Sequence, residues 1–139
     1  MTVALAHQAS SAAKDLALRE AAREALLRQT DLAVLHIVES LDLDVADAYR
    51  RGLTDDIEAA LAELGARDVS WQLQLDVGDN NVAEKILGLT DKVGAEVLVI
   101  GARRRSPVGK FFLGSVTQTL ILEANVPVLV VKTAGSGPA

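Results

Sequence analysis

The segment from Ala95 to Lys132 constrains the fold more than any other part of the sequence, because its pattern is that of strand, polar loop, helix and strand. The first apolar, β-branched run, Glu96 to Ile100, is followed by Gly101, where we expect the strand to end. A second apolar run, Val128 to Val131, follows a proline that stops the intervening helix. Two buried strands joined through a helix predict a right-handed crossover in a parallel sheet.

The rest of the chain repeats this alternation of apolar runs and amphipathic stretches. Further strands are expected at Thr2–Ala6, Asp31–Val38 and Val69–Leu75, and further helices from Ser10 or Ser11 to about Gln29, from Ala46 to Leu64 and from Val82 to Val93. Gly52 lies inside the second of these helical patterns and could bend or break that helix. The order βαβαβαβαβ predicts an α/β protein with an open parallel sheet and helices on both faces.

The loop and helix start between the last two strands carry the chemistry of an anion site. Gly101 would let a ligand approach the backbone closely, and Gly114 to Thr117 offer unpaired N–H groups at a helix N-terminus. Arg103 to Arg105 and Lys110 add positive charge to the same loop. The alternative is an N-capped helix behind a basic, solvated turn. The residues alone leave both interpretations open.

Composition argues against several classes of function. The net charge of −5 argues against general nucleic-acid binding, and the absence of cysteine excludes disulfides, thiolate zinc sites and a cysteine nucleophile. The two histidines are far apart in the sequence, so they give no sign of a metal site. No Walker motif, pair of acids at a defined spacing or serine motif is present. We therefore predict that the protein is not an enzyme.

The chain of 139 residues is long enough for one domain with a single core. We expect this domain to span residues 1–132 and the small, polar segment 133–139 to be a disordered tail. The N-terminus lacks the basic region and apolar core of a signal peptide, and no apolar run approaches the length of a membrane span. A cytoplasmic location without membrane contact is therefore expected.

The last third of the chain resembles the signature of the universal stress protein family. That signature is Gly, two residues, Gly, nine residues, Gly, and then Ser or Thr. Gly101, Gly114 and Ser115 match it, and Arg104 stands at the second glycine. The segments LGSVT and VPVLVVK are also similar to the sequences that family members have in this region. The resemblance implies an adenine-nucleotide alpha-hydrolase-like fold with strand order 3-2-1-4-5, and ATP or another adenine nucleotide as the ligand.

The resemblance also implies which residues meet the nucleotide. His7 stands where nucleotide-binding members have an Asp, and a neutral imidazole can accept only one ribose hydroxyl. A solvent-facing loop histidine is an equal alternative there. Ile37 falls on an apolar adenine contact, although ordinary core packing is the favoured interpretation. The full set of implied contacts is Ala6, His7, Ile37, Ile100, Gly101, Arg103, Arg104, Gly114, Ser115, Val116 and Thr117.

Arg104 leaves two outcomes open. Its side chain could fill the space that a glycine leaves for the phosphates and so exclude ATP, or it could pair with a phosphate in bidentate fashion. The leading hypothesis is a stress-response module that binds an adenine nucleotide without committed catalysis. The alternatives are a family member that binds no nucleotide and acts as a protein-interaction module, and a slow ATP hydrolase.

The last strand, Pro127 to Lys132, should lie at a sheet edge with unpaired backbone groups. Pairing with the same strand of a second copy, antiparallel about a two-fold axis, would satisfy those groups. Members of the family that this chain resembles commonly dimerise in this way. We therefore expect a homodimer through Val128, Leu129, Val130 and Val131, with a monomer whose tail covers the edge as the alternative.

Overall fold

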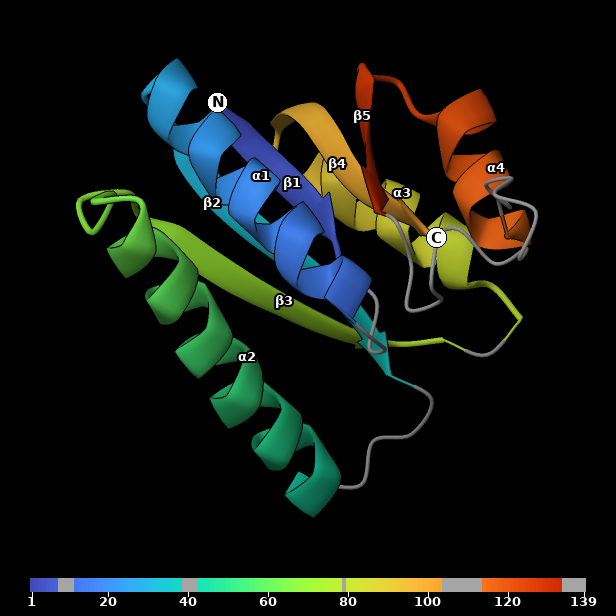
Figure 1. The fold of residues 1–139 in the computed structure, drawn as a ribbon. Helices are drawn as coiled ribbons and strands as arrows, with labels where there is room; N and C mark the ends of the chain where they lie inside the picture. The colour runs from blue at the N-terminus through green and yellow to red at the C-terminus, as the bar shows by residue number, and fades with distance from the viewer. Residues whose placement is uncertain (8–11, 39–42, 79, 104–113, 134–139) are drawn as a thin grey trace.

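The computed structural model describes residues 1–7, 12–38, 43–78, 80–103 and 114–133. Strands and helices alternate along the chain, as Figure 1 shows. The elements are β1 (Thr2–Ala6), α1 (Ala12–Arg28), β2 (Asp31–Val38), α2 (Leu43–Glu63), β3 (Trp71–Val77), α3 (Val82–Lys92), β4 (Ala95–Arg103), α4 (Ser115–Glu123) and β5 (Val128–Thr133).

The five strands form one parallel sheet in the order β3-β2-β1-β4-β5, which confirms the predicted fold class and strand order. At the carboxyl end of β1, Ala6 lies opposite Leu35 of β2 and Ile100 of β4. The chain runs outward in one direction from β1 to β3 and in the other from β4 to β5. The carboxyl ends of β1 and β4 therefore form the point where α/β sheets usually bind ligands.

The two faces of the sheet are covered by different helices. Figure 1 shows α1 and α2 on one face and α3 and α4 on the other. Side chains of β1 alternate between these layers: Val3 and Leu5 pack in the α1/α2 cluster, whereas Ala4 and Ala6 pack in the α3/α4 cluster. Every residue of β1 is buried, because the strand is central and has a helical layer on each side.

Two strands differ from the boundaries that their sequence pattern predicts. β4 does not end at Gly101 but continues to Arg103, because Gly101 pairs with Val131 of β5 and the ladder continues beyond it. β3 begins at Trp71 and not at Val69, because the N–H of Val69 donates to the carbonyl of Ala66, at 3.0 Å, in the preceding turn. Hydrogen bonds to other parts of the chain therefore set these limits, and local hydropathy does not.

One helical prediction also needs correction. α2 continues through Gly52, so this glycine does not break the helix. On α4, Leu120 is buried and Ile121 is exposed. Thr133 is the last residue of β5. Ser10, Ser11 and the remainder of the expected tail, 134–139, lie outside the described residues.

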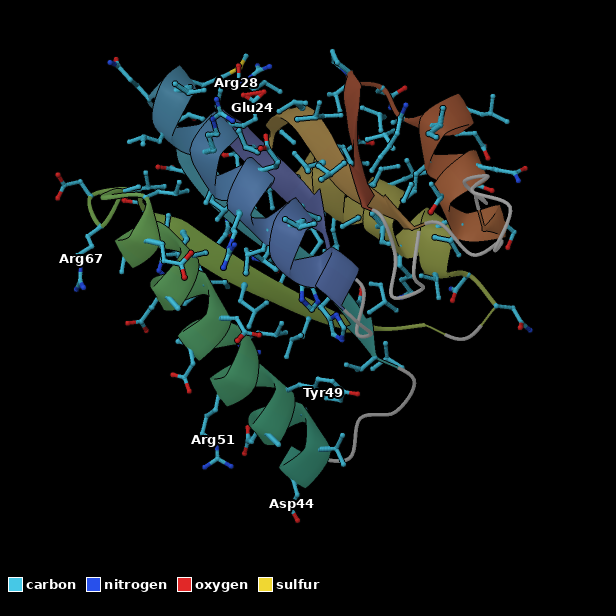
Figure 2. All side chains as sticks on the ribbon, in the orientation of Figure 1. Glu24, Arg28, Asp44, Tyr49, Arg51 and Arg67 are labelled. Atoms are coloured by element: carbon cyan, nitrogen blue, oxygen red, sulfur yellow. The ribbon has the colours of Figure 1, made fainter. Side chains whose placement is uncertain are left out.

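At the amino edge of the sheet, away from the carboxyl ends of the strands, an ion pair of Arg28 joins α1 to β4. Arg28 lies 4.0 Å from Glu24 on its own helix and 3.8 Å from Glu96 at the start of β4. Figure 2 shows Glu24 and Arg28 side by side. Because these groups are partly exposed, each pair contributes at most about 1 kcal/mol. No helix in the described part of the chain is both long and apolar enough to cross a bilayer.

Candidate functional site

Several of the residues predicted to meet a nucleotide lie together at the carboxyl edge, on the α3/α4 face. Ala6, Ile37, Ile100 and Val116 belong to, or pack against, the same apolar cluster. The side chains of Ala6 and Ile100 are buried, so any contact with a ligand would come from their backbone. Ile37 is only partly buried, and its core packing agrees with the favoured interpretation.

The start of α4 has a glycine as its N-cap residue. Gly114 is the N-cap residue, with φ −65° and ψ 165° and no side-chain cap, and its carbonyl accepts the N–H of Gln118 at 3.0 Å. These dihedral angles are allowed for any residue. Among the described residues, a Cβ atom at Gly114 would meet nothing within 4 Å. Packing within the described part of the chain therefore does not require glycine here, whereas close approach of a ligand would.

The two hydroxyl residues of the first turn are placed differently. Ser115 is exposed, and its carbonyl accepts the hydroxyl of Thr119 at 2.9 Å. Thr117 is buried beneath the helix. Ser115 is therefore the hydroxyl that a ligand at this helix start would meet first, and Thr117 contributes through its backbone N–H.

The glycine and arginine positions at the end of β4 are only partly described. Gly101 and Arg103 lie within β4 and pair with Val131 and Thr133 of β5. Arg104, which stands at the second glycine of the family signature, lies outside the described residues. Both outcomes for Arg104 therefore stay open.

His7 is not a solvent-facing loop residue, so that expectation is wrong. Its N–H continues the sheet by donating to the carbonyl of Leu35 at 2.9 Å, and the residue is only 7% exposed. Because side chains alternate along β1, His7 follows Val3 and Leu5 onto the α1/α2 face. The sheet thus separates its side chain from the start of α4.

The side chain of His7 contacts His36 of β2. Their Nδ1 atoms are 3.1 Å apart, and Nδ1 of His36 also lies 3.3 Å from the carbonyl oxygen of His7. A carbonyl can only accept a hydrogen bond, so we assign the proton to Nδ1 of His36, which leaves Nδ1 of His7 as an acceptor. In this assignment the ring proton of His7 is on Nε2.

This histidine pair was missed in the sequence because the two residues lie in different strands. A signal was nonetheless present. In a parallel sheet with β1 beside β2, the register that aligns Ala6 with Leu35 aligns His7 with His36. Within the described residues no group of three or more histidines, cysteines and acids could hold a metal ion, so the pair is not part of such a cluster.

A cavity of about 480 Å³ lies beneath the first half of α2, and His7 forms part of its wall. The ring of Tyr49 on α2 lies 5.3 Å from the ring of His36, which lies 5.1 Å from that of His7. Among the described residues the lining consists of His7, Asp44, Val45, Ala48, Tyr49, Gly52, Leu53 and Asp56.

Residues 1–132 match the model of the Universal stress protein family. A universal stress protein of Mycolicibacterium smegmatis is 40% identical over 119 residues, which cover 86% of this chain and 88% of that protein. A solved universal stress protein from Archaeoglobus fulgidus is 31% identical with a TM-score of 0.73, covering 95% of this chain and 98% of that one. A universal stress protein from Archaeoglobus fulgidus in complex with dAMP is 26% identical with a TM-score of 0.68, at the same coverage.

Proposed function

Since this chain belongs to the universal stress protein family, we propose that it is a stress-response protein that binds an adenine nucleotide at the carboxyl edge of its sheet. The observation that carries the proposal is the start of α4. The described residues give Gly114 no steric reason to be glycine, and it is the N-cap residue directly before the N–H groups of the first helical turn. Such a turn attracts phosphate through its N–H groups and its dipole.

The nucleotide would lie with its phosphates at Gly114 to Thr117 and its nucleoside along the carboxyl ends of β1 and β4. The related Archaeoglobus fulgidus protein solved with dAMP supports an adenine nucleotide as the ligand class. The register supports it too, because Ala6 and Ile100 lie opposite each other at the point where the strand order reverses.

Calorimetry with ATP, AMP and dAMP tests the proposal. Gly114→Val should weaken binding at least about tenfold, which corresponds to about 1.4 kcal/mol, because the added side chain fills the space that a phosphate needs. Gly88→Val is the matched control, since Gly88 lies on α3 and a Cβ there also meets nothing within 4 Å. Equal nucleotide affinities for the two variants would show that the phosphates do not bind at this helix start.

The rival function is a protein-interaction module that binds no nucleotide, and the arginine at position 104 favours it. The variant Arg104→Gly tests whether Arg104 blocks the phosphates or pairs with one of them. If Arg104 blocks the phosphates, the variant should gain at least about tenfold in ATP affinity; if Arg104 pairs with a phosphate, the variant should lose a similar factor. Absence of nucleotide binding by both the parent and the variant would favour the interaction module.

We also propose that a bound nucleotide is held and not turned over. The described part of the chain contains no group of three or more histidines, cysteines and acids that could hold a metal ion. Phosphate release measured with ATP and magnesium tests this proposal. Turnover that is lost in Gly114→Val and kept in Gly88→Val would instead indicate a slow ATP hydrolase at the same site.

A further inference from the structure

The edge of β3 that faces away from β2 has no neighbouring strand within the described part of the chain. The N–H of Leu32 donates to the carbonyl of Ser70, and the N–H of Gly78 donates to that of Val38, at 2.9 and 3.0 Å. Because bonding residues alternate along a parallel ladder, the even-numbered residues of β3 bond to β2. The odd-numbered residues of β3 direct their backbone groups outward; they are Trp71, Leu73, Leu75 and Val77.

The sequence of β3 makes this edge prone to pair with another chain. Apolar and polar residues alternate along WQLQLDV, and the four apolar side chains are only partly buried. Trp71 and Leu73 pack against the α1/α2 cluster, so the apolar side chains share that face of the sheet. An exposed edge with an apolar face is a template for strand addition and aggregation, and natural sheets usually protect it with a charged side chain or a covering element.

Asp76 places a carboxylate on this edge. Its Oδ1 accepts the N–H of Val77 at 2.8 Å, so one of the outward donors is already bonded within the chain. Its Oδ2 lies 3.6 Å from Nζ of Lys85 on α3. Because side chains alternate along a strand, Asp76 lies on the α3/α4 face, opposite to Trp71 and Leu73. The bond to Val77 and the ion pair with Lys85 orient the carboxylate beside the outward backbone groups at the carboxyl end of β3.

The addition of a strand along β3 would have to break these contacts. The new strand would offer a carbonyl oxygen to the N–H of Val77, and that oxygen would lie next to the carboxylate of Asp76. Oxygens that only accept hydrogen bonds repel each other in such a position, and the new strand would also remove water from the carboxylate. We propose that Asp76 prevents the edge of β3 from pairing with a strand of a second copy of the chain.

This role of Asp76 determines how far copies of the chain can associate. Figure 1 shows β3 and β5 at opposite ends of the sheet, and the sequence of β5, VLVVKT, contains no carboxylate that could accept an outward N–H. Copies that pair through one edge alone form a closed pair, whereas copies that pair through both edges form an open-ended row. Asp76 therefore limits association to the edge of β5. The inference applies equally to a parent protein that is a monomer, and it does not depend on nucleotide binding.

Light scattering on Asp76→Ala tests the proposal. At equal, high micromolar concentration, the mean mass of this variant should be at least about twice that of the parent, because the edge of β3 becomes available. Asp68→Ala is the matched control and should keep the parent's mass, since Asp68 is an exposed acid in the turn before β3 and its loss changes the net charge equally. Urea denaturation confirms that both variants are folded. A folded Asp76→Ala variant with the parent's mass, or equal association of the two variants, would overturn the proposal.

Amide hydrogen exchange tests the same contacts residue by residue. In the parent, the N–H of Val77 should exchange at least about fivefold more slowly than the outward N–H of Leu75, because Val77 donates to Asp76. In Asp76→Ala, the N–H of Leu75 should become protected at least about tenfold as concentration rises, whereas that of Gln74, which bonds to β2, should not change. Equal exchange of Val77 and Leu75 in the parent would show that the carboxylate does not cover this edge, and would contradict the proposal.

A second substitution shows which edge the Asp76→Ala variant uses. Adding Leu75→Pro removes an outward N–H near the centre of β3 and leaves the bonds to β2 intact, so the double variant should return to the parent's mass. Association that persists in a folded double variant would mean that the copies meet elsewhere, and Asp76 would then have no part in protecting the edge of β3.

Discussion

The imidazoles of His7 and His36 constrain each other's protonation, because their Nδ1 atoms are 3.1 Å apart and the carbonyl of His7 lies beside one of them. A proton on both Nδ1 atoms would set two donors against each other. The pair therefore selects different tautomers for two residues of the same type. This consequence arises from two side chains and one carbonyl.

We expect ¹⁵N-detected imidazole spectra at pH 8 to show His36 as the Nδ1–H tautomer and His7 as the Nε2–H tautomer. The physical reason is that Nδ1 of His36 must donate to the carbonyl of His7, 3.3 Å away. In the His36→Gln variant, the spectrum of His7 should be close to that of free imidazole, which is a mixture of the two tautomers. The Nδ1–H form at both residues in the parent would contradict the assignment.

Gly78, at the end of β3, is a glycine that the packing does require. A Cβ there would lie 2.8 Å from Cγ2 of Ile37 and 3.2 Å from Oδ1 of Asn81, and the Gly78 N–H donates to the carbonyl of Val38 at 3.0 Å. Gly78→Ala should therefore lower the free energy of unfolding by about 1–3 kcal/mol through overpacking. Urea denaturation measures this change.

Gly88→Ala provides the comparison for that measurement. Gly88 lies within α3, where a Cβ has open space. The alanine should stabilise the protein by up to about 1 kcal/mol through helix propensity. Loss of stability in both variants would mean that the contact with Ile37 is not the cause of the loss in Gly78→Ala.

At the scale of the elements, α1 is followed by Gln29 with φ 54°, while α2 and α3 are followed by Gly65 and Gly94 with φ 64° and 67°. Left-handed backbone after a helix is the usual place for glycine, and a residue with a side chain is strained there by about 1 kcal/mol. Gln29→Gly should therefore raise the free energy of unfolding by several tenths to about 1 kcal/mol. Thermal unfolding should show a rise of a few degrees, and Gly65→Ala should show a fall of similar size. An unchanged or lower melting temperature for Gln29→Gly would exclude strain at this position.

The strands whose limits were predicted correctly are those whose ends are marked in the local sequence pattern. Thr2–Ala6 and Asp31–Val38 are apolar runs followed by the polar residues His7 and Glu39, and both strands have those bounds. The limits of β3 and β4 follow instead from hydrogen bonds to other parts of the chain, since a turn holds Val69 before β3 and the ladder with β5 carries β4 past Gly101. Local pattern predicts where a strand can form, and the neighbouring strand decides how far it continues.

The candidate sites divide in the same way. Gly114 and Ser115 were predicted at a helix start because the glycine, the serine and the apolar spacing that follows are contiguous. The contact of His7 with His36 depends on the register of two strands, and the cavity depends on where α2 leaves the sheet. These features come from the arrangement of elements, so no single stretch of sequence contains them.

At the scale of the whole molecule, the sheet ends in two open edges, β3 and β5. The N–H of Leu98 donates to the carbonyl of Pro127 at 3.0 Å. Because bonding residues alternate along a parallel ladder, Leu129 and Val131 direct their backbone groups toward β4. Val128 and Val130 then present theirs at the open edge. The edge strand is therefore able to pair with another strand without losing any bond to β4.

We propose that two copies of the chain pair antiparallel through β5, and we expect Val130→Pro to give a folded monomer. The substitution removes an outward N–H and leaves the bonds to β4 intact, and proline is tolerated on an edge strand in that position. Leu129→Pro is the matched variant: it removes an inward N–H, so it should destabilise the fold instead. Light scattering at micromolar concentration gives the masses, and urea denaturation confirms folding. A parent mass near 14.7 kDa, that of one chain, would contradict the dimer. So would a Val130→Pro variant that remains folded and keeps the dimeric mass, because the outward donor of Val130 would then have no part in the assembly.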